Sequence, residues 1–183
     1  LGVLCVTMFL GVSLAWLTSM YDFYGRRIFE RLLLMPLAIP AYVMAFVYTG
    51  LFDFSGPFRT FFRSYFPSLS PYIPEIRSAK GVILVMSFAL FPYVFLMASS
   101  GFRSMGKTMV EASQALGAGK TKTLFKVIFP LARPWVFGGL LLVLMETLAD
   151  FGAVSVFNYD TFTTAVYKAW YGFFSISAAS QLA

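Results

Sequence analysis

The sequence predicts an all-α protein that crosses a membrane several times. Of its residues, 59% are hydrophobic and only 12% are charged, whereas a soluble domain carries about a quarter charged residues. The apolar residues also occur in uninterrupted runs of roughly 20, the length that a helix needs to cross the hydrocarbon core of a bilayer. Both observations favour a polytopic helical bundle.

Four apolar runs are long enough to span a bilayer, and a fifth begins near the end of the chain. The four cover Leu1–Met20, Leu32–Phe52, Gly81–Phe102 and Trp135–Phe157, and the fifth starts at Ile176. Both ends of the sequence fall inside apolar runs, so we expect residues 1–183 to be one transmembrane domain that is incomplete at both ends, a fragment of about five spans.

Two prolines lie one helical turn apart in the second run, within the stretch "MPLAIPAY". Pro36 and Pro40 each remove a backbone hydrogen bond, and the freed carbonyl groups need other partners inside lipid. Two interpretations remain open: kinks that help the bundle to pack, or a hinge that gates a substrate.

The connections between the runs predict the orientation of the chain. Short connections rich in Lys and Arg stay on the cytoplasmic side. The first connection carries Arg26, Arg27 and Arg31, and the third, residues 103–134, is strongly basic with the single acid Glu111. Both therefore face the cytoplasm, and the long second connection faces outward. The net charge of +6 follows from this topology and does not indicate nucleic-acid binding.

The residue inventory argues against most enzymes. The chain has no histidine and one cysteine, Cys5, which excludes imidazole ligands, Ser-His hydrolysis and an intrachain disulfide. The stretch "LGAGKTKTLF" ends like a phosphate-binding loop, but that loop needs a glycine where Gln114 stands, and a preceding strand. We therefore expect no catalytic residue, no metal site and no bound cofactor in this chain.

The third connection has the pattern of two short helices joined by a glycine elbow. Small and apolar residues recur at helical spacing at Met109, Ala112, Ser113 and Leu116. Gly117 and Gly119 interrupt this pattern, and a second apolar patch follows at Leu124, Val127 and Ile128. Pro130 is predicted to end the second helix. Such a unit between two spans is suited to dock against another protein.

This segment resembles the cytoplasmic signature of permease subunits in binding-protein-dependent ABC importers, the type I (MetI-like) transmembrane bundle. The signature reads Glu-Ala-Ala, three residues, Gly, nine residues, Ile, one residue, Leu-Pro. The positions that match are Glu111, Ala112, Gly117 and Pro130. The conservative replacements are Ser113 for Ala, Val127 for Ile and Phe129 for Leu.

The resemblance implies that the segment docks in a groove of a separate ATP-binding subunit. The coupling residues would then be Glu111, Ala112, Ser113, Leu116, Gly117 and Pro130. Glu111 would contact the ATPase or cap its own helix, and Gly117 would form a turn where a side chain does not fit. ATP and Mg would belong to the partner, so this chain is not expected to be an enzyme. In the alternative, these residues only fold a cytoplasmic hairpin.

Other stretches look like permeases for ferric iron, and together they cover nearly all of the chain: "PLAIPAY", "METLADFGAVSVF" and "DTFTTAVYKAWY". Related importers of thiamine, sulfate or polyamines share much of this layout. The implied partners are a dimer of ATP-binding subunits, a periplasmic binding protein and a second permease core, in a bacterial or archaeal inner membrane. The second connection and residues 158–174 are candidate docking surfaces for the binding protein.

Two acids lie one turn apart in the fourth run. Glu146 falls near the predicted middle of that run and Asp150 follows on the same face, where an unpaired charge costs at least about 2.5 kcal/mol. They could line the path of a hard cation, which prefers oxygen ligands, or bond to neighbouring helices and fix the bundle. They also support a different class, an ion-coupled secondary transporter that uses Glu146 and Asp150 as proton or cation sites.

Overall fold

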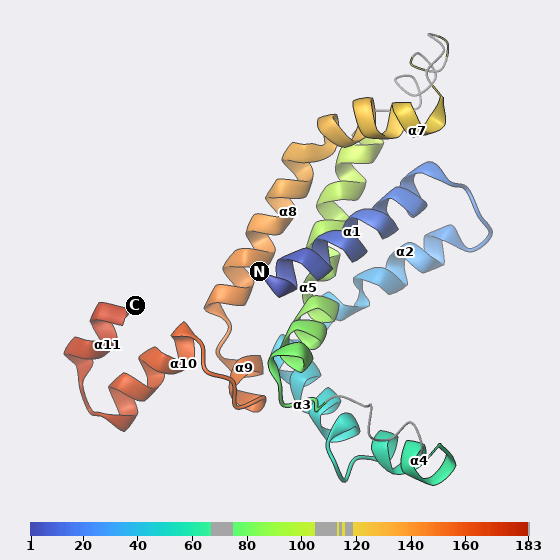
Figure 1. Ribbon diagram of the computed structural model, residues 1–183. Coiled ribbons are helices and arrows are strands. Elements are labelled where there is room, and N and C mark those ends of the chain that lie inside the picture. The colour runs from blue at the N-terminus through green and yellow to red at the C-terminus, as the bar shows by residue number, and fades with distance from the viewer. Residues whose placement is uncertain (67–74, 105–112, 114, 116–118, 183) are drawn as a thin grey trace. The chain divides into compact units, whose positions relative to one another are not determined.

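The structure is a computed structural model that describes residues 1–66, 75–104, 113, 115 and 119–182. Every regular element in these residues is a helix or a helical turn (Figure 1), which confirms the all-α fold for the described chain. The helices form two compact units, Leu1–Leu37 with Leu90–Leu144, and Ala38–Ala89 with Met145–Ala183. Two long helices, α5 (Ala79–Ser104) and α8 (Phe129–Ala149), contribute to both units.

Three helices of the described chain are long and apolar enough to cross a bilayer. They are Gly2–Met20, Ala79–Ser104 and Lys126–Ala149. A fourth span exists if the two helices on either side of Ile39 and Pro40 are counted as one. The helices agree with a polytopic membrane domain. The second predicted run, Leu32–Phe52, is not one helix, because the chain bends by 94° at the break around Ile39 and Pro40, and the fourth run also differs, as described below.

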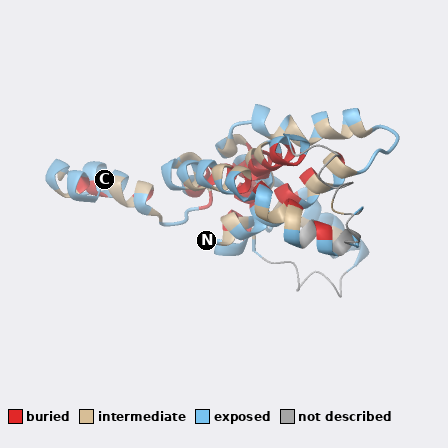
Figure 2. Cartoon of the chain, turned by 90° about the horizontal axis from the view of Figure 1, so that it is seen from above, coloured by how far each residue is buried: buried red, intermediate tan, exposed pale blue. Residues whose placement is uncertain are grey.

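The first unit is built around the second half of α5, with α1 (Gly2–Met20) and α8 packed against it. A Cβ atom on Gly11 of α1 would lie 2.7 Å from the Val94 Cβ atom, and one on Gly139 of α8 would lie 2.9 Å from the Val94 Cα atom. Small residues allow this close approach, which drives helix association in lipid. Ala15, Val94 and Val143 of these three helices are fully buried. Figure 2 colours the buried residues of the chain red.

The first unit also holds α2 (Arg26–Leu34), α7 (Lys120–Thr123) and the π-helical turn Leu124–Ile128. Pro130 does not end a helix there, so that prediction is wrong: it is the second residue of α8. The missing N–H group of a proline is tolerated in the first turn of a helix, and a π-helical turn shifts the preceding hydrogen bonds. The chain therefore passes through Pro130 without stopping.

Besides its parts of α5 and α8, the second unit contains the following short helices among its described residues. They are α3 (Ala41–Phe52), α4 (Pro57–Tyr65), α9 (Gly152–Val156), α10 (Phe162–Tyr167) and α11 (Ile176–Leu182). A 3₁₀ turn, Met35–Ala38, precedes α3, and a π-helical turn, Lys168–Gly172, follows α10. α3 begins directly after Pro40, because a proline disfavours helical geometry in the residue before it.

The fourth predicted run, Trp135–Phe157, is not one helix. α8 begins earlier, at Phe129, and ends at Ala149, and α9 starts after a break at Asp150 and Phe151. Glu146 consequently lies in the last turn of α8, and its predicted place near the middle of a span is wrong. Asn158 ends this region with a φ of 53°, a left-handed conformation that asparagine tolerates better than most residues.

Candidate coupling and translocation sites

The predicted coupling segment, residues 103–134, connects α5 to α8. Four of its predicted site residues, Glu111, Ala112, Leu116 and Gly117, lie outside the described residues, so their roles stay predictions. Two others are described: Ser113 is helical and half-buried, and Pro130 lies in the first turn of α8.

One hydrogen bond closes the coupling segment on itself. The Ser113 and Thr123 hydroxyl groups lie 2.8 Å apart, and Thr123 is buried with 1% of its surface exposed. Ser113 belongs to the first half of the segment and Thr123 to α7, so the two halves are in contact. This contact fits the predicted helical hairpin, whether it docks on a partner or only folds on itself.

The Gly-Lys-Thr stretch lies at the start of α7. Gly119 is exposed and precedes the helix, and its carbonyl oxygen accepts a hydrogen bond from the Thr123 N–H group at 3.0 Å. Lys120 and Thr121 belong to the first turn of α7. In the described part of the chain, Gly119 therefore directly precedes α7, and Lys120 and Thr121 form its first turn, which fits the start of the second predicted helix.

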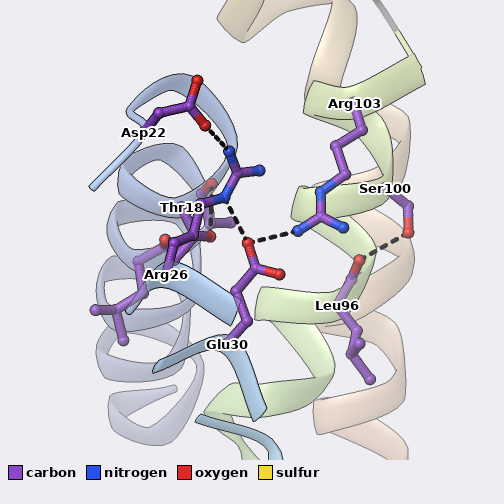
Figure 3. Close-up of polar contacts among 9 residues, drawn as sticks. Thr18, Asp22, Arg26, Glu30, Leu96, Ser100 and Arg103 are labelled. Atoms are coloured by element: carbon purple, nitrogen blue, oxygen red, sulfur yellow. Dashed lines mark hydrogen bonds and ion pairs between the residues drawn. The ribbon is translucent and has the colours of Figure 1, made fainter. Parts of the chain in front are cut away.

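A charged cluster lies where the coupling segment leaves α5. Figure 3 shows the Arg26 and Arg103 side chains pointing toward Glu30. The Glu30 Oε1 atom accepts a hydrogen bond from Arg26 Nε at 2.9 Å. The same atom forms an ion pair with Arg103 Nη2 at 2.8 Å. Arg26 also pairs with Asp22. Arg103, in the last turn of α5, is thereby joined to α2.

The cluster keeps Glu30 ionised. Partial burial acts to raise the pKa of its carboxyl group, but the hydrogen bonds and positive charges of Arg26 and Arg103 outweigh this, and the pKa is lowered. Beside it lies an open pocket of about 820 Å³, whose lining includes Arg26, Arg27 and Arg103. The spacing of Asp22, Arg26 and Glu30 at i, i+4 and i+8 is readable from the sequence, but the pairing with Arg103 is not.

Asp150 has a clear structural partner. Its Oδ2 atom accepts a hydrogen bond from the Val154 N–H group at 3.1 Å, so the carboxylate satisfies the start of α9. Its carbonyl oxygen accepts a hydrogen bond from the Thr163 hydroxyl group at 2.7 Å. Glu146, one turn earlier, is exposed. The two acids therefore differ in environment, although they share a helix face in the sequence.

Next to Asp150, α3 contacts α9, and each of these helices begins after an interruption of the helical backbone. A Cβ atom on Gly152 of α9 would lie 2.8 Å from the Tyr42 Cβ atom of α3. α3 starts after Pro40 and α9 starts after Asp150. Discontinuous helices of this kind form the substrate sites of many transporters, because their free backbone groups line a cavity. The second unit thus brings two helix breaks and one carboxylate together.

Comparison with known families decides what this bundle is. Residues 7–180 match the model of the family described as binding-protein-dependent transport system inner membrane component. The chain belongs to this family. The predicted resemblance is confirmed over almost the whole chain, and the helix pattern is that of a membrane component.

Relatives within this family differ in the substrate that their names give. An Fe(3+)-transport system permease protein from Haemophilus influenzae is 31% identical over 181 residues, covering 97% of this chain and 32% of that protein. A sulfate transport system permease protein from Escherichia coli is 27% identical over 144 residues, 79% of this chain and 50% of the relative. A molybdenum transport system permease protein from Haemophilus influenzae is 25% identical over 174 residues, 94% and 74% respectively. The chain spans about a third of the length of the iron relative and half of the length of the sulfate relative.

Proposed function

We propose that the chain is the membrane-spanning permease part of an ATP-driven importer. A periplasmic binding protein delivers the substrate, separate ATP-binding subunits hydrolyse ATP, and the coupling segment carries their movement to the spans. The observation that carries this proposal is the position of residues 103–134, which join two membrane-length helices, α5 and α8. A partner that shifts this segment shifts the ends of both helices.

The coupling segment is suited to move as a unit. The Ser113–Thr123 hydrogen bond links its two halves, and the Glu30–Arg103 ion pair links its start to α2. Closure of the ATP-binding subunits would then bias the bundle between outward-facing and inward-facing states, as in other switching transitions. The closed ATP-binding subunits can shift this equilibrium only if they bind one state of the bundle more tightly than the other.

We propose ferric iron as the substrate. The support is the iron relative, which aligns over 181 residues, and the two acids beside the break between α8 and α9, Glu146 and Asp150. Fe³⁺ is a hard cation that prefers oxygen ligands, whereas carboxylates repel an oxyanion such as the sulfate named for other relatives. The exposed Glu146 is the better candidate for a cation contact, because Asp150 caps α9.

ATP hydrolysis in liposomes tests the importer proposal. The full-length protein is reconstituted with its candidate ATP-binding subunit, and the binding protein is added empty or loaded with ferric iron or sulfate. We expect stimulation by the iron-loaded form. Glu111→Lys should lose that stimulation together with binding of the ATP-binding subunit, whereas the matched change Glu75→Lys, outside the coupling segment, should keep that subunit bound. Stimulation by sulfate alone would keep the importer and reject iron, and no association with any ATPase would reject the importer.

Uptake of radioactive iron tests the acid contact separately. Glu146→Gln removes a charge without changing size, and we expect a lower uptake rate at unchanged protein yield. Asp22→Asn is the matched control, because Asp22 is an exposed acid that pairs with Arg26 and lies outside the helix breaks and both candidate docking surfaces. Equal uptake by both variants would remove Glu146 from the transport path.

A further inference from the structure

The short helix α4 (Pro57–Tyr65) divides cleanly into an aromatic and a polar face. At about 100° per residue, the aromatic residues fall on one arc: Phe58, Phe61, Phe62 and Tyr65. Arg59, Thr60, Arg63 and Ser64 occupy the rest of the helix, which carries no acid. A helix with an aromatic stripe and a basic polar face is typical of segments that lie at a membrane surface.

Half of the aromatic face packs on the protein and half stays free. Phe58 contacts Phe52 at the end of α3 and Phe62 of its own helix, with ring centroids 4.4 and 4.7 Å apart. Phe61 and Tyr65 stack on each other at 4.7 Å but remain 52% and 70% exposed. Among the described residues, no other helix covers this outer edge, and both aromatic rings remain exposed.

α4 is fixed close to the end of α3, which belongs to the bent pair of helices that could form a fourth span. Only Asp53–Gly56 separate it from α3, a stretch that reaches at most about 14 Å. Gly56 makes this turn tight, since a Cβ atom there would lie 2.4 Å from the Leu51 carbonyl oxygen. Arg63 Nη2 donates to the Phe54 carbonyl oxygen at 3.1 Å, and Arg77 pairs with Asp53 at 3.2 Å. α4 is therefore held against the end of α3.

We propose that α4 is an interfacial helix whose outer aromatic edge, Phe61 and Tyr65, inserts into lipid at the membrane–water boundary. Phenyl and phenol rings settle at this depth, with the phenol hydroxyl group at the headgroups. The helix itself carries no acid that would repel lipid phosphates. The partner of this surface is the bilayer, and the proposal holds whether or not the chain imports iron.

Spin-label accessibility on the full-length protein in phosphatidylcholine–phosphatidylglycerol vesicles tests this inference. The sequence has a single cysteine, so a Cys5→Ser background leaves only the introduced label. Tyr65→Cys places a nitroxide on the aromatic edge, and Thr60→Cys places one about 140° away on the polar face. Phe61→Cys gives a second position on the aromatic edge in case Tyr65→Cys does not assemble.

We expect the ratio of collisions with oxygen to collisions with a water-soluble nickel complex to be several-fold higher at position 65 than at position 60. Addition of the loaded binding protein should leave the label at position 65 unchanged. Equal ratios at the two positions would overturn the proposal. So would protection from both reagents at position 65, which means that protein covers the edge, and so would protection that appears only with the binding protein, which means that the edge docks that protein.

Discussion

The Glu30 carboxylate links Arg26 and Arg103, with its Oε1 atom 2.9 Å from Arg26 Nε and 2.8 Å from Arg103 Nη2. Glu30 and Arg26 belong to α2, and Arg103 is the first residue of the coupling segment. The three side chains are 20%, 26% and 50% exposed. This contact joins the start of the coupling segment to α2.

The Glu30–Arg103 pair should contribute measurably to stability. A double-mutant cycle with Glu30→Ala and Arg103→Ala in detergent should give a coupling energy of about 1 kcal/mol, at the upper end for exposed pairs because Glu30 is mostly covered. The Asp53–Arg77 pair is the matched control, with side chains 42% and 54% exposed, and its coupling should be smaller. A larger coupling for the control would contradict this ranking.

The same carboxylate should make stability depend on pH. The folded state lowers the pKa of Glu30, so its contribution is fully present above the ordinary glutamate pKa and is lost as the pH falls through the lowered value. The difference in unfolding free energy between the wild-type protein and Glu30→Gln should therefore shrink in acid. A difference that stays constant across this range would show that the charge of Glu30 does not stabilise the fold.

The α1–α5 crossing should not tolerate a side chain on Gly11. Gly11→Ala places a methyl group 2.7 Å from the Val94 Cβ atom, and overpacking of this kind costs about 1–3 kcal/mol. Gly50→Ala makes the same change in α3 where nothing lies within 4 Å of the new methyl group. It should be neutral or slightly stabilising, since alanine favours helix. Thermal unfolding of both variants in the same detergent provides the comparison.

Asp150 offers a way to separate capping from cation contact. Asp150→Ala removes the acceptor for the Val154 N–H group and should cost about 0.5–2 kcal/mol of stability. Asp150→Asn keeps an acceptor and should restore most of this loss. If iron uptake returns with the asparagine variant, Asp150 acts as a cap. If stability returns while uptake does not, the charge itself contacts the cation.

Continuous apolar runs made α1 and α5 predictable, because length and composition alone define a span. The break at Asp150 was not predictable, since Phe151 to Val156 are as apolar as the residues before them and the bond from Thr163 comes from another helix. The prediction that Pro130 ends a helix was wrong because a π-helical turn precedes it and Pro130 lies in the first turn of α8. The spacing of Glu111 to Pro130 indicated the family correctly, while Glu30 was missed because its partner Arg103 is distant in sequence.

The central claim, that residues 103–134 dock on an ATP-binding subunit, is tested most directly by site-specific cross-linking. In a Cys5→Ser background, Ala115→Cys places a photoreactive label on an exposed helical position of the segment, and Ser64→Cys places one on the exposed polar face of α4. The account predicts an adduct between position 115 and the ATP-binding subunit, with none from position 64. Labelled, folded protein that forms no adduct at position 115 while the subunit is bound would contradict it.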